Sequence, residues 1–269
     1  MRIARPSWKA AIPWFALIVS QAGDPAVAVG QTLDLERYAL TFSEDFDKLD
    51  VSPRGPGTRW IAHTPWNGDF GSAQFTDPRP AFPFQTKDGI LTITMQKGSD
   101  GKWRSGLLSS ADAKGNGFTQ SGGYFEVRAR FPAGPGVWPA FWLCSVDFTG
   151  AGKPEIDIVE HYGHDPSRYF TAVHIWKDNK DVYYKNKAIP VEDGSLSADY
   201  HTYGASIDKE FVTFYFDRKA VWREPTKPEY LNPVFILVNL AAGGGWPITG
   251  MPSPSVMSVD YIRAYQLKP

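Results

Sequence analysis

Three carboxylates lie close together in the stretch EIDIVEHYG, residues 155–163. Glu155, Asp157 and Glu160 are separated only by apolar residues, which is typical of a β-strand with one polar and one apolar face. Because side chains alternate along a strand, a regular strand would place Glu155 and Asp157 on one face and Glu160 on the other. Either Glu160 is a misplaced charge or the strand is irregular.

A β-bulge near Ile158 and Val159 would remove this conflict, because one extra residue returns Glu160 to the face of the other two acids. Four strand intervals span about 13 Å between α-carbons, but a bulge and a concave sheet bring the carboxyls of Glu155 and Glu160 closer. A separation of roughly 5 Å suits retaining glycoside hydrolysis, in which one carboxylate attacks the anomeric carbon and the other protonates the leaving oxygen. The spacing therefore predicts this reaction type.

Each acid has its own predicted task in this chemistry. Glu155 is the predicted nucleophile, ionised at neutral pH. Glu160 is the predicted acid/base, with its pKa raised by neighbouring negative charges and partial burial. Asp157 is expected to hydrogen-bond Glu155 and hold its orientation. For the motif taken alone, the alternative is a solvated strand with ordinary acidic residues.

The runs around this strand predict an all-β fold that would position it. Leu91, Ile93 and Met95 share one face of ILTITMQ, and GYFEVRARF alternates likewise. FVTFYFDRKAVW indicates a hairpin that turns at residues 217–219, and VFILVNLA suits a central strand covered on both faces. Many short strands between Gly and Pro residues, without a long amphipathic helix, indicate a β-sandwich or jelly roll.

The first 28 residues have the pattern of a secretory signal peptide. Three basic residues precede an apolar run over 10–19, and Ala-Val-Ala at 26–28 suits a signal peptidase. The run is too short to span a bilayer. We therefore expect a signal peptide over 1–28, a single domain over 29–269, and a secreted or periplasmic protein without membrane association. An uncleaved anchor is the alternative.

The composition narrows the classes of partner. The net charge is −1 and no basic cluster offers a phosphate footprint, so we expect no nucleic-acid partner. The glycine triplet 243–245 lacks the Lys-Ser/Thr pair of a phosphate loop, which excludes nucleotide binding there.

The single cysteine, Cys144, is expected in the core, and the stability of the domain must come without internal disulfides. Ten tryptophans are more than a core of this size usually holds, which favours some exposed rings that stack on sugars, although core packing remains the default for any one of them. No heptads are present, so we expect a monomer.

At this point the chain resembles glycoside hydrolase family 16, the clan of laminarinases, lichenases, agarases and related endo-glycanases. The matching stretches come in the family's order and cover nearly all of the predicted mature chain: FSEDFDKLD, KDGILTI, GYFEVRARFPAGPGVWPAFWL, EIDIVEHYG, HTYGASIDKEFVTFYFDRKAVW, VFILVNLAAGGGWP and SVDYIRAYQ. The resemblance implies a jelly roll of two curved antiparallel sheets with an open concave cleft for a long polysaccharide. It assigns nucleophile, helper and acid/base to Glu155, Asp157 and Glu160.

The resemblance also indicates substrate-binding residues. Trp138 and Trp142 lie four apart and are expected on one strand face, with Trp138 the stronger candidate for the tryptophan beneath the sugar next to the scissile bond. His174 and Trp176 share a face of the next strand, where His174 could bind a sugar hydroxyl or be structural. Trp246 is expected at the cleft mouth. Further candidates, with core or surface packing as the alternative, are Trp66, Asn67, Trp103 and Arg104.

Family members often carry a calcium ion on the convex side, away from catalysis. The positions that match its ligands are Asp45 and Gly89, through backbone oxygens, and Asp260. Oxygen ligands from separate segments suit Ca²⁺ and would tie the chain ends together in a domain without disulfides. A loop without metal is the alternative, and no cofactor is expected for catalysis.

The leading interpretation is a secreted retaining endo-β-glycanase that hydrolyses internal β-1,3 and/or β-1,4 bonds of a glucan-like polysaccharide. HTPWNGDFG and KWRSGLLSS replace the loops expected of a typical laminarinase, and are similar to those of bacterial members that trim the producer's own exopolysaccharide. A transglycosylase on the same polysaccharides is a second interpretation. A non-catalytic polysaccharide-binding jelly roll is a third, although binding alone does not need three acids on one strand.

Overall fold

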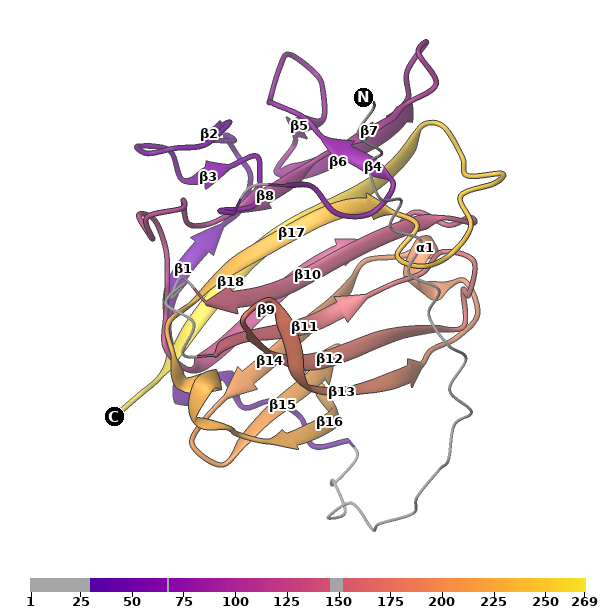
Figure 1. The fold of residues 1–269 in the computed structure, drawn as a ribbon. Coiled ribbons are helices and arrows are strands. Elements are labelled where there is room, and N and C mark those ends of the chain that lie inside the picture. The colour runs from indigo at the N-terminus through magenta and orange to yellow at the C-terminus, as the bar shows by residue number, and fades with distance from the viewer. Residues whose placement is uncertain (1–29, 67, 146–151) are drawn as a thin grey trace, which may run out of the picture.

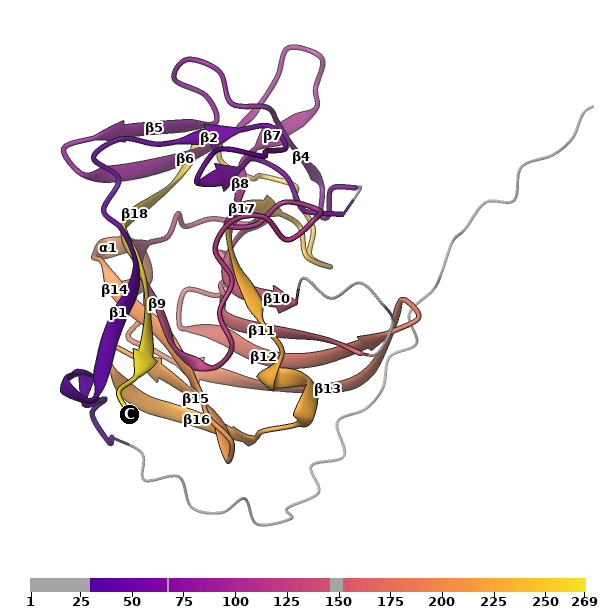
Figure 2. The same ribbon diagram turned by 90° about the vertical axis from the view of Figure 1, so that its left-hand side faces the viewer.

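The protein is built from two packed β-sheets (Figures 1 and 2). The structure, a computed structural model, describes residues 30–66, 68–145 and 152–269. Helical structure in these ranges is limited to η1 (Leu35–Arg37), α1 (Ser195–Ala198) and η2 (Pro228–Leu231). Within the same ranges, no helix combines the length and apolar character needed to cross a membrane. The predicted all-β class is confirmed, and the predicted signal peptide lies outside the described residues.

The first sheet has ten strands. In spatial order they are β16 (Lys219–Pro225), β15 (Phe211–Phe216), β14 (His201–Ile207), β9 (Gly123–Arg130), β18 (Ser255–Leu267), β6 (Ile90–Lys97), β7 (Trp103–Ser105) and β4 (Ala73–Phe75). Two further strands join this path at its centre: β1 (Tyr38–Glu44) pairs with β18, and β5 (Phe84–Lys87) pairs with β6.

The second sheet has eight strands and carries the acidic stretch. Its order is β13 (Lys180–Pro190), β12 (Arg168–Lys177), β11 (Lys153–Glu160), β10 (Val137–Ser145), β17 (Val234–Ala242), β8 (Leu107–Ser109), β3 (Trp60–Ile61) and β2 (Val51–Ser52). Figure 2 separates β10 to β13 of this sheet from β1, β9, β14 and β18 of the other. The antiparallel prediction is confirmed for the long strands, whereas two short pairs, β2 with β3 and β4 with β7, are parallel.

The core lies between the two sheets and follows the predicted alternation. Leu91, Ile93 and Met95 of β6 are fully buried, as are all nine residues of the central strand β17. The hairpin of β15 and β16 turns at Asp217 and Arg218, with φ of 48° and 60°. Positive φ at both central residues is typical of the two-residue turn whose twist matches the flanking strands.

The core packs against one face of β11. The other face of this strand is therefore free to form a site.

Candidate active site

The acidic strand β11 is irregular where the sequence predicted it. Asp157 pairs with Ala172 and Glu160 with Phe170 of β12, so three steps along β11 match two steps along its neighbour. The pairing of β11 with β10 shifts at the same place. One extra residue therefore lies in β11, and the predicted β-bulge is confirmed.

The bulge places the acids and the apolar residues of β11 on opposite faces. Ile156, Ile158 and Val159 are buried in the core between the sheets. The three acids instead line a cleft of about 810 Å³ on the other face. The floor and walls of this cleft are largely aromatic, and include Trp66, Phe70, Trp138, Trp142, Tyr162 and Trp176. Cys144 is buried in the cleft floor, opposite Glu155.

Glu160 is held by two donors from the cleft wall. Trp138 Nε1 donates to Glu160 Oε1 at 3.0 Å, and the Tyr162 hydroxyl donates to the same oxygen at 3.3 Å. Burial, followed by the negative charge of Asp157, raises the pKa of Glu160 to about 8, against the opposing effect of these donors. The carboxyl therefore carries a proton at neutral pH, which is the state that a general acid needs.

Glu155 and Asp157 lie beside a histidine from the neighbouring strand. His174 pairs with Glu155 across β11 and β12, and its Nε2 lies 3.2 Å from Asp157 Oδ2. One carboxylate oxygen of Glu155, one of Asp157 and one ring nitrogen of His174 all lie within 4.8 Å of one another. Burial, followed by the charge of Asp157, raises the pKa of Glu155, and the positive charge of His174 opposes this rise. A cation at this position therefore favours the ionised form that a nucleophilic carboxylate needs.

His174 has a second carboxylate on its other nitrogen, because Nδ1 lies 2.8 Å from Asp181 Oδ2. Burial alone would lower the pKa of His174. The hydrogen bonds and charges of Asp157 and Asp181 outweigh burial and raise that pKa to about 9. His174 is therefore the cation of the acidic cluster.

Five of the predicted substrate-binding residues line the cleft: Trp66, Trp138, Trp142, His174 and Trp176. Trp246 lies at its edge, where its ring is 4.3 Å from that of His164 and 6.4 Å from that of Tyr162. With 51% of its surface exposed, Trp246 remains available to a ligand. Asn67 lies outside the described residues.

Trp103 and Arg104 are not brought to the cleft, because their strand β7 belongs to the ten-stranded sheet. Trp103 points inward and is packed in the core with 9% exposure. Arg104 points outward and forms an ion pair with Asp100 at 2.7 Å. The sequence could not exclude these two residues, since alternation shows which faces a strand has but not which sheet it joins.

Tyr162 is a cleft residue that the sequence analysis missed. Its ring stacks on Trp138 with centroids 5.9 Å apart and planes 18° apart, and its hydroxyl bonds Glu160. The signal was available, because Tyr162 follows Glu160 by two residues and alternation places such pairs on one face. The sequence also did not predict two residues of β13: Tyr184, which lines the cleft, and Asp181, which contacts His174. The register of that strand with β12 cannot be derived from its sequence.

Gly244, the middle residue of the glycine triplet, packs against these two rings. A Cβ on Gly244 would lie 2.7 Å from Tyr162 Cε1 and 2.8 Å from Trp138 Cδ2, and its φ is +61°. Glycine is therefore required here both by the close approach of the rings and by the backbone conformation. At Gly245, whose φ is +91°, a Cβ would meet nothing within 4 Å.

The residues predicted to bind calcium lie on or beside neighbouring strands: Asp45 follows β1, Gly89 precedes β6, and Asp260 belongs to β18, which pairs with both. β18 has a bulge at Asp260, because Val259 pairs with Ala129 and Tyr261 with Arg128 of β9, so two steps along β18 match one step along β9. A Cβ on Gly89 would lie 3.5 Å from the backbone oxygen of Asp45. The backbone oxygen of Asp45 therefore lies close to Gly89, which fits the expected ligand set.

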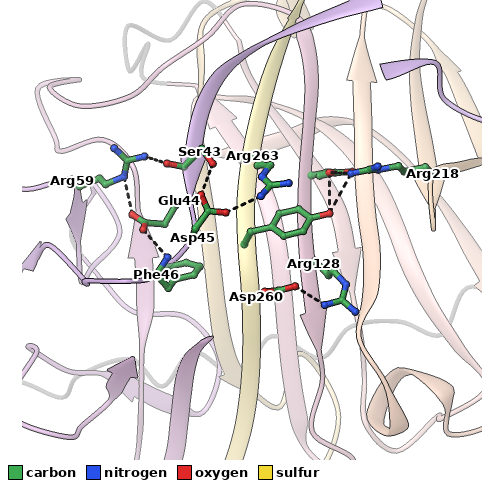
Figure 3. Close-up of polar contacts among 11 residues, drawn as sticks. Ser43, Glu44, Asp45, Phe46, Arg59, Arg128, Arg218, Asp260 and Arg263 are labelled. Atoms are coloured by element: carbon green, nitrogen blue, oxygen red, sulfur yellow. Dashed lines mark hydrogen bonds and ion pairs between the residues drawn. The ribbon is translucent and has the colours of Figure 1, made fainter. Parts of the chain in front are cut away.

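The carboxylates of the same region are paired with arginines. Asp260 Oδ2 lies 2.5 Å from Arg128 Nη1, and Asp45 Oδ1 accepts a hydrogen bond from Arg263 at 2.8 Å (Figure 3). A calcium ion bound through the Asp260 carboxylate would have to compete with Arg128.

We expect Gly244→Ala to destabilise the protein by about 2 kcal/mol more than Gly245→Ala, because only the first adds an overpacked contact. Both substitutions place a side chain at positive φ, so the difference between them isolates the contact with Trp138 and Tyr162. Chemical denaturation would measure the free energy of unfolding, and near-UV circular dichroism would report the stacked rings. Equal destabilisation by the two variants would contradict the packing role of Gly244.

Comparison with known proteins identifies the family of the chain. The family model described as Glycosyl hydrolases family 16 matches residues 78–262. The endo-1,3-1,4-beta-glycanase ExsH of Rhizobium meliloti (strain 1021) is 34% identical over 260 residues, which cover 87% of this chain and 54% of ExsH. The endo-1,3-1,4-beta-glycanase EglC of the same organism is 31% identical over 278 residues, covering 94% of this chain and 57% of EglC. The chain thus spans a little over half the length of these relatives.

A solved structure agrees with the fold. The X-ray structure of the laminarinase from Rhodothermus marinus matches with a TM-score of 0.69 at 26% identity, covering 86% of this chain and 98% of that one. The family model alone covers more than half of the chain. The resemblance noted in the sequence is therefore confirmed, and the chain belongs to the glycosyl hydrolases of family 16.

Proposed function

We propose that the protein is a retaining endo-β-glycanase that hydrolyses internal β-glycosidic bonds of a glucan-like polysaccharide or a bacterial exopolysaccharide. The observation that carries this proposal is the β11 bulge, which gathers Glu155, Asp157 and Glu160 in one aromatic-lined cleft. The elevated pKa of Glu160 supports its role as proton donor. We also propose that the protein is exported and acts as a monomer, on the basis of its N-terminal sequence and the absence of heptads.

The reaction proceeds in two steps on the chain's own residues. In the first step, the Glu155 carboxylate attacks the anomeric carbon and forms a covalent ester, while Glu160 gives its proton to the departing glycosidic oxygen. In the second step, the Glu160 carboxylate takes a proton from a water molecule, which attacks the same carbon and releases Glu155. Trp138 donates to Glu160 and is the candidate for the ring beneath the sugar.

The substrate class follows from the relatives. ExsH and EglC are described as endo-1,3-1,4-beta-glycanases, and the Rhodothermus marinus structure as a laminarinase. A β-glucan with 1,3 and 1,4 linkages is therefore the first candidate, and an exopolysaccharide with such linkages the second.

The test is release of reducing ends from mixed-linkage β-glucan, β-1,3-glucan, agarose, carrageenan and an acidic bacterial exopolysaccharide. We expect the wild type to cut one of these internally and Glu155→Ala to lose at least about 10³-fold in rate, because no nucleophile remains. Azide should restore part of the activity of Glu155→Ala and yield a glycosyl azide of inverted configuration.

The outcomes separate the alternatives. Rescue of Glu160→Ala with an inverted azide product, and no rescue of Glu155→Ala, would exchange the two roles. Products longer than the substrate would favour the transglycosylase. Tight binding without release of reducing ends, unchanged by Glu155→Gln, would favour the polysaccharide-binding protein.

We expect Tyr162→Phe to move the alkaline limb of the kcat/KM profile upward by roughly half a pH unit. The Tyr162 hydroxyl donates to Glu160 and so favours its ionised form. Without this donor the pKa of Glu160 rises, and the general acid keeps its proton to a higher pH. The matched control is Tyr183→Phe, which removes a hydroxyl that bonds Glu224 instead. A limb that moves equally in both variants, or not at all, would contradict the assignment of Glu160.

We further propose a structural calcium ion held by backbone oxygens of Asp45 and Gly89 and by Asp260, with no part in catalysis. Ca²⁺ should raise the melting temperature of the wild type above its value in EDTA, because an ion that binds only the folded state stabilises it. Asp260→Ala should abolish this rise, whereas Arg128→Ala, which frees the Asp260 carboxylate, should keep or enlarge it. Identical melting temperatures with Ca²⁺ and EDTA would refute the site.

A further inference from the structure

Asp181 belongs to β13, the edge strand of the eight-stranded sheet, and its carboxylate contacts His174 of the candidate active site. The pairing of β12 with β13 is irregular between Ile175 and Trp176, which leaves Asp181 opposite Trp176. Its carboxylate lies 2.8 Å from His174 Nδ1 and its side chain is 27% exposed. Asp181 is not among the described residues that line the cleft, so it acts on the site through its contact with His174 and through its charge, which also raises the pKa of Glu155 and of Asp157.

Both ring nitrogens of His174 face a carboxylate oxygen. Nε2 lies 3.2 Å from Asp157 Oδ2, and Nδ1 lies 2.8 Å from Asp181 Oδ2. A neutral imidazole has a single N–H, so one of these contacts would then set a nitrogen lone pair against a carboxylate oxygen. When both carboxyls are ionised, only the imidazolium, which carries an N–H on each nitrogen, satisfies both partners.

The ring plane of His174 is fixed as well. The Tyr184 ring stacks on it with centroids 4.6 Å apart and planes 28° apart, and the Trp176 ring stacks with centroids 5.7 Å apart and planes 14° apart. The direction of the Nε2–H bond toward Asp157 is therefore set by aromatic packing and by Asp181 on the opposite nitrogen.

We propose that Asp181 is a positioning residue that keeps His174 an imidazolium, whose second N–H orients Asp157 and whose charge favours the ionised form of Glu155. The catalytic consequence rests on the proposed glycanase function. The charge state of His174 does not depend on that function and can be measured by itself.

The pH dependence follows from the groups around His174. Those that face it are Glu155, Asp157 and Glu160 from β11, and Asp181 and Tyr184 from β13. The carboxylates favour the cation, and burial raises the pKa of Tyr184, which stays neutral. Removing the charge of Asp181 lowers the pKa of His174. The imidazolium then persists below the new pKa and is lost above it, so the defect must grow with pH.

The experiment compares Asp181→Asn with the wild type and with Asp217→Asn. Asp217 provides a matched control because it holds His201 Nδ1 at 2.9 Å on the ten-stranded sheet, away from the cleft. Histidine NMR should give a pKa near 9 for His174 in the wild type and in Asp217→Asn. In Asp181→Asn this pKa should fall to about 6.5, the ordinary value for histidine.

Kinetics supply the second readout. The ratio of wild-type to Asp181→Asn kcat should be about twofold or less near pH 5 and about tenfold near pH 7.5, with KM changed by less than about twofold. A merely structural role would lower activity by the same factor at both pH values. Asp181→Glu, which can restore the carboxylate contact, should recover part of the loss at the higher pH.

A neutral His174 in the wild type near pH 7.5, visible from the ¹⁵N shifts of its ring, would overturn the proposal without any variant. An unchanged pKa in folded Asp181→Asn, or a kcat ratio that does not vary with pH, would also overturn it. If the wild type cuts none of the polysaccharides, the proposed function fails, while the NMR measurement still decides the charge state.

Discussion

The one-residue bulge in β11 is the constraint on which the active site depends. In a regular strand, Glu160 would point into the core among Ile156 and Ile158, where an ionised carboxylate without partners is strongly unfavourable. The bulge turns Glu160 back to the cleft and leaves Val159 to complete the core. One inserted residue therefore satisfies the packing of the sandwich and the chemistry of the cleft at once.

Once the acids share a face, their charges must be balanced. Four carboxyls, those of Glu155, Asp157, Glu160 and Asp181, lie around the cationic ring of His174. Because burial strengthens repulsion among them, the groups cannot all ionise together. Burial raises the pKa of both Glu155 and Glu160, and the positive charge of His174, which lies beside Glu155 and Asp157, opposes this rise. The position of His174 beside Glu155 therefore supports the proposed division into nucleophile and proton donor.

Much of this arrangement could be predicted from the sequence, because it depends on local periodicity. The spacing of Glu155, Asp157 and Glu160 implied the bulge, and the alternation in 90–97 gave the correct core face. Long-range pairing could not be predicted in the same way. Tyr124 and Glu126 of β9 alternate with core residues and would be expected at the surface, yet both are fully buried.

The burial of Glu126 depends on a residue that is distant in sequence. Arg218, at the turn of the hairpin of β15 and β16, bonds both oxygens of Glu126. The contact of Asp181 with His174 was invisible for the same reason, since it depends on an irregular register between two strands.

The position of β13 at the edge of its sheet has a consequence for how the protein responds to heat. A strand with a neighbour on one side only opens locally more readily than the central strands of the same sheet. Most of its residues are exposed, whereas β17 is buried along its whole length. Since Asp181 is carried by this strand, fraying at the sheet edge would withdraw one of the two anchors of His174 while the sandwich stays folded. Fraying of this one edge strand would therefore impair the site at a lower temperature than the melting of the domain.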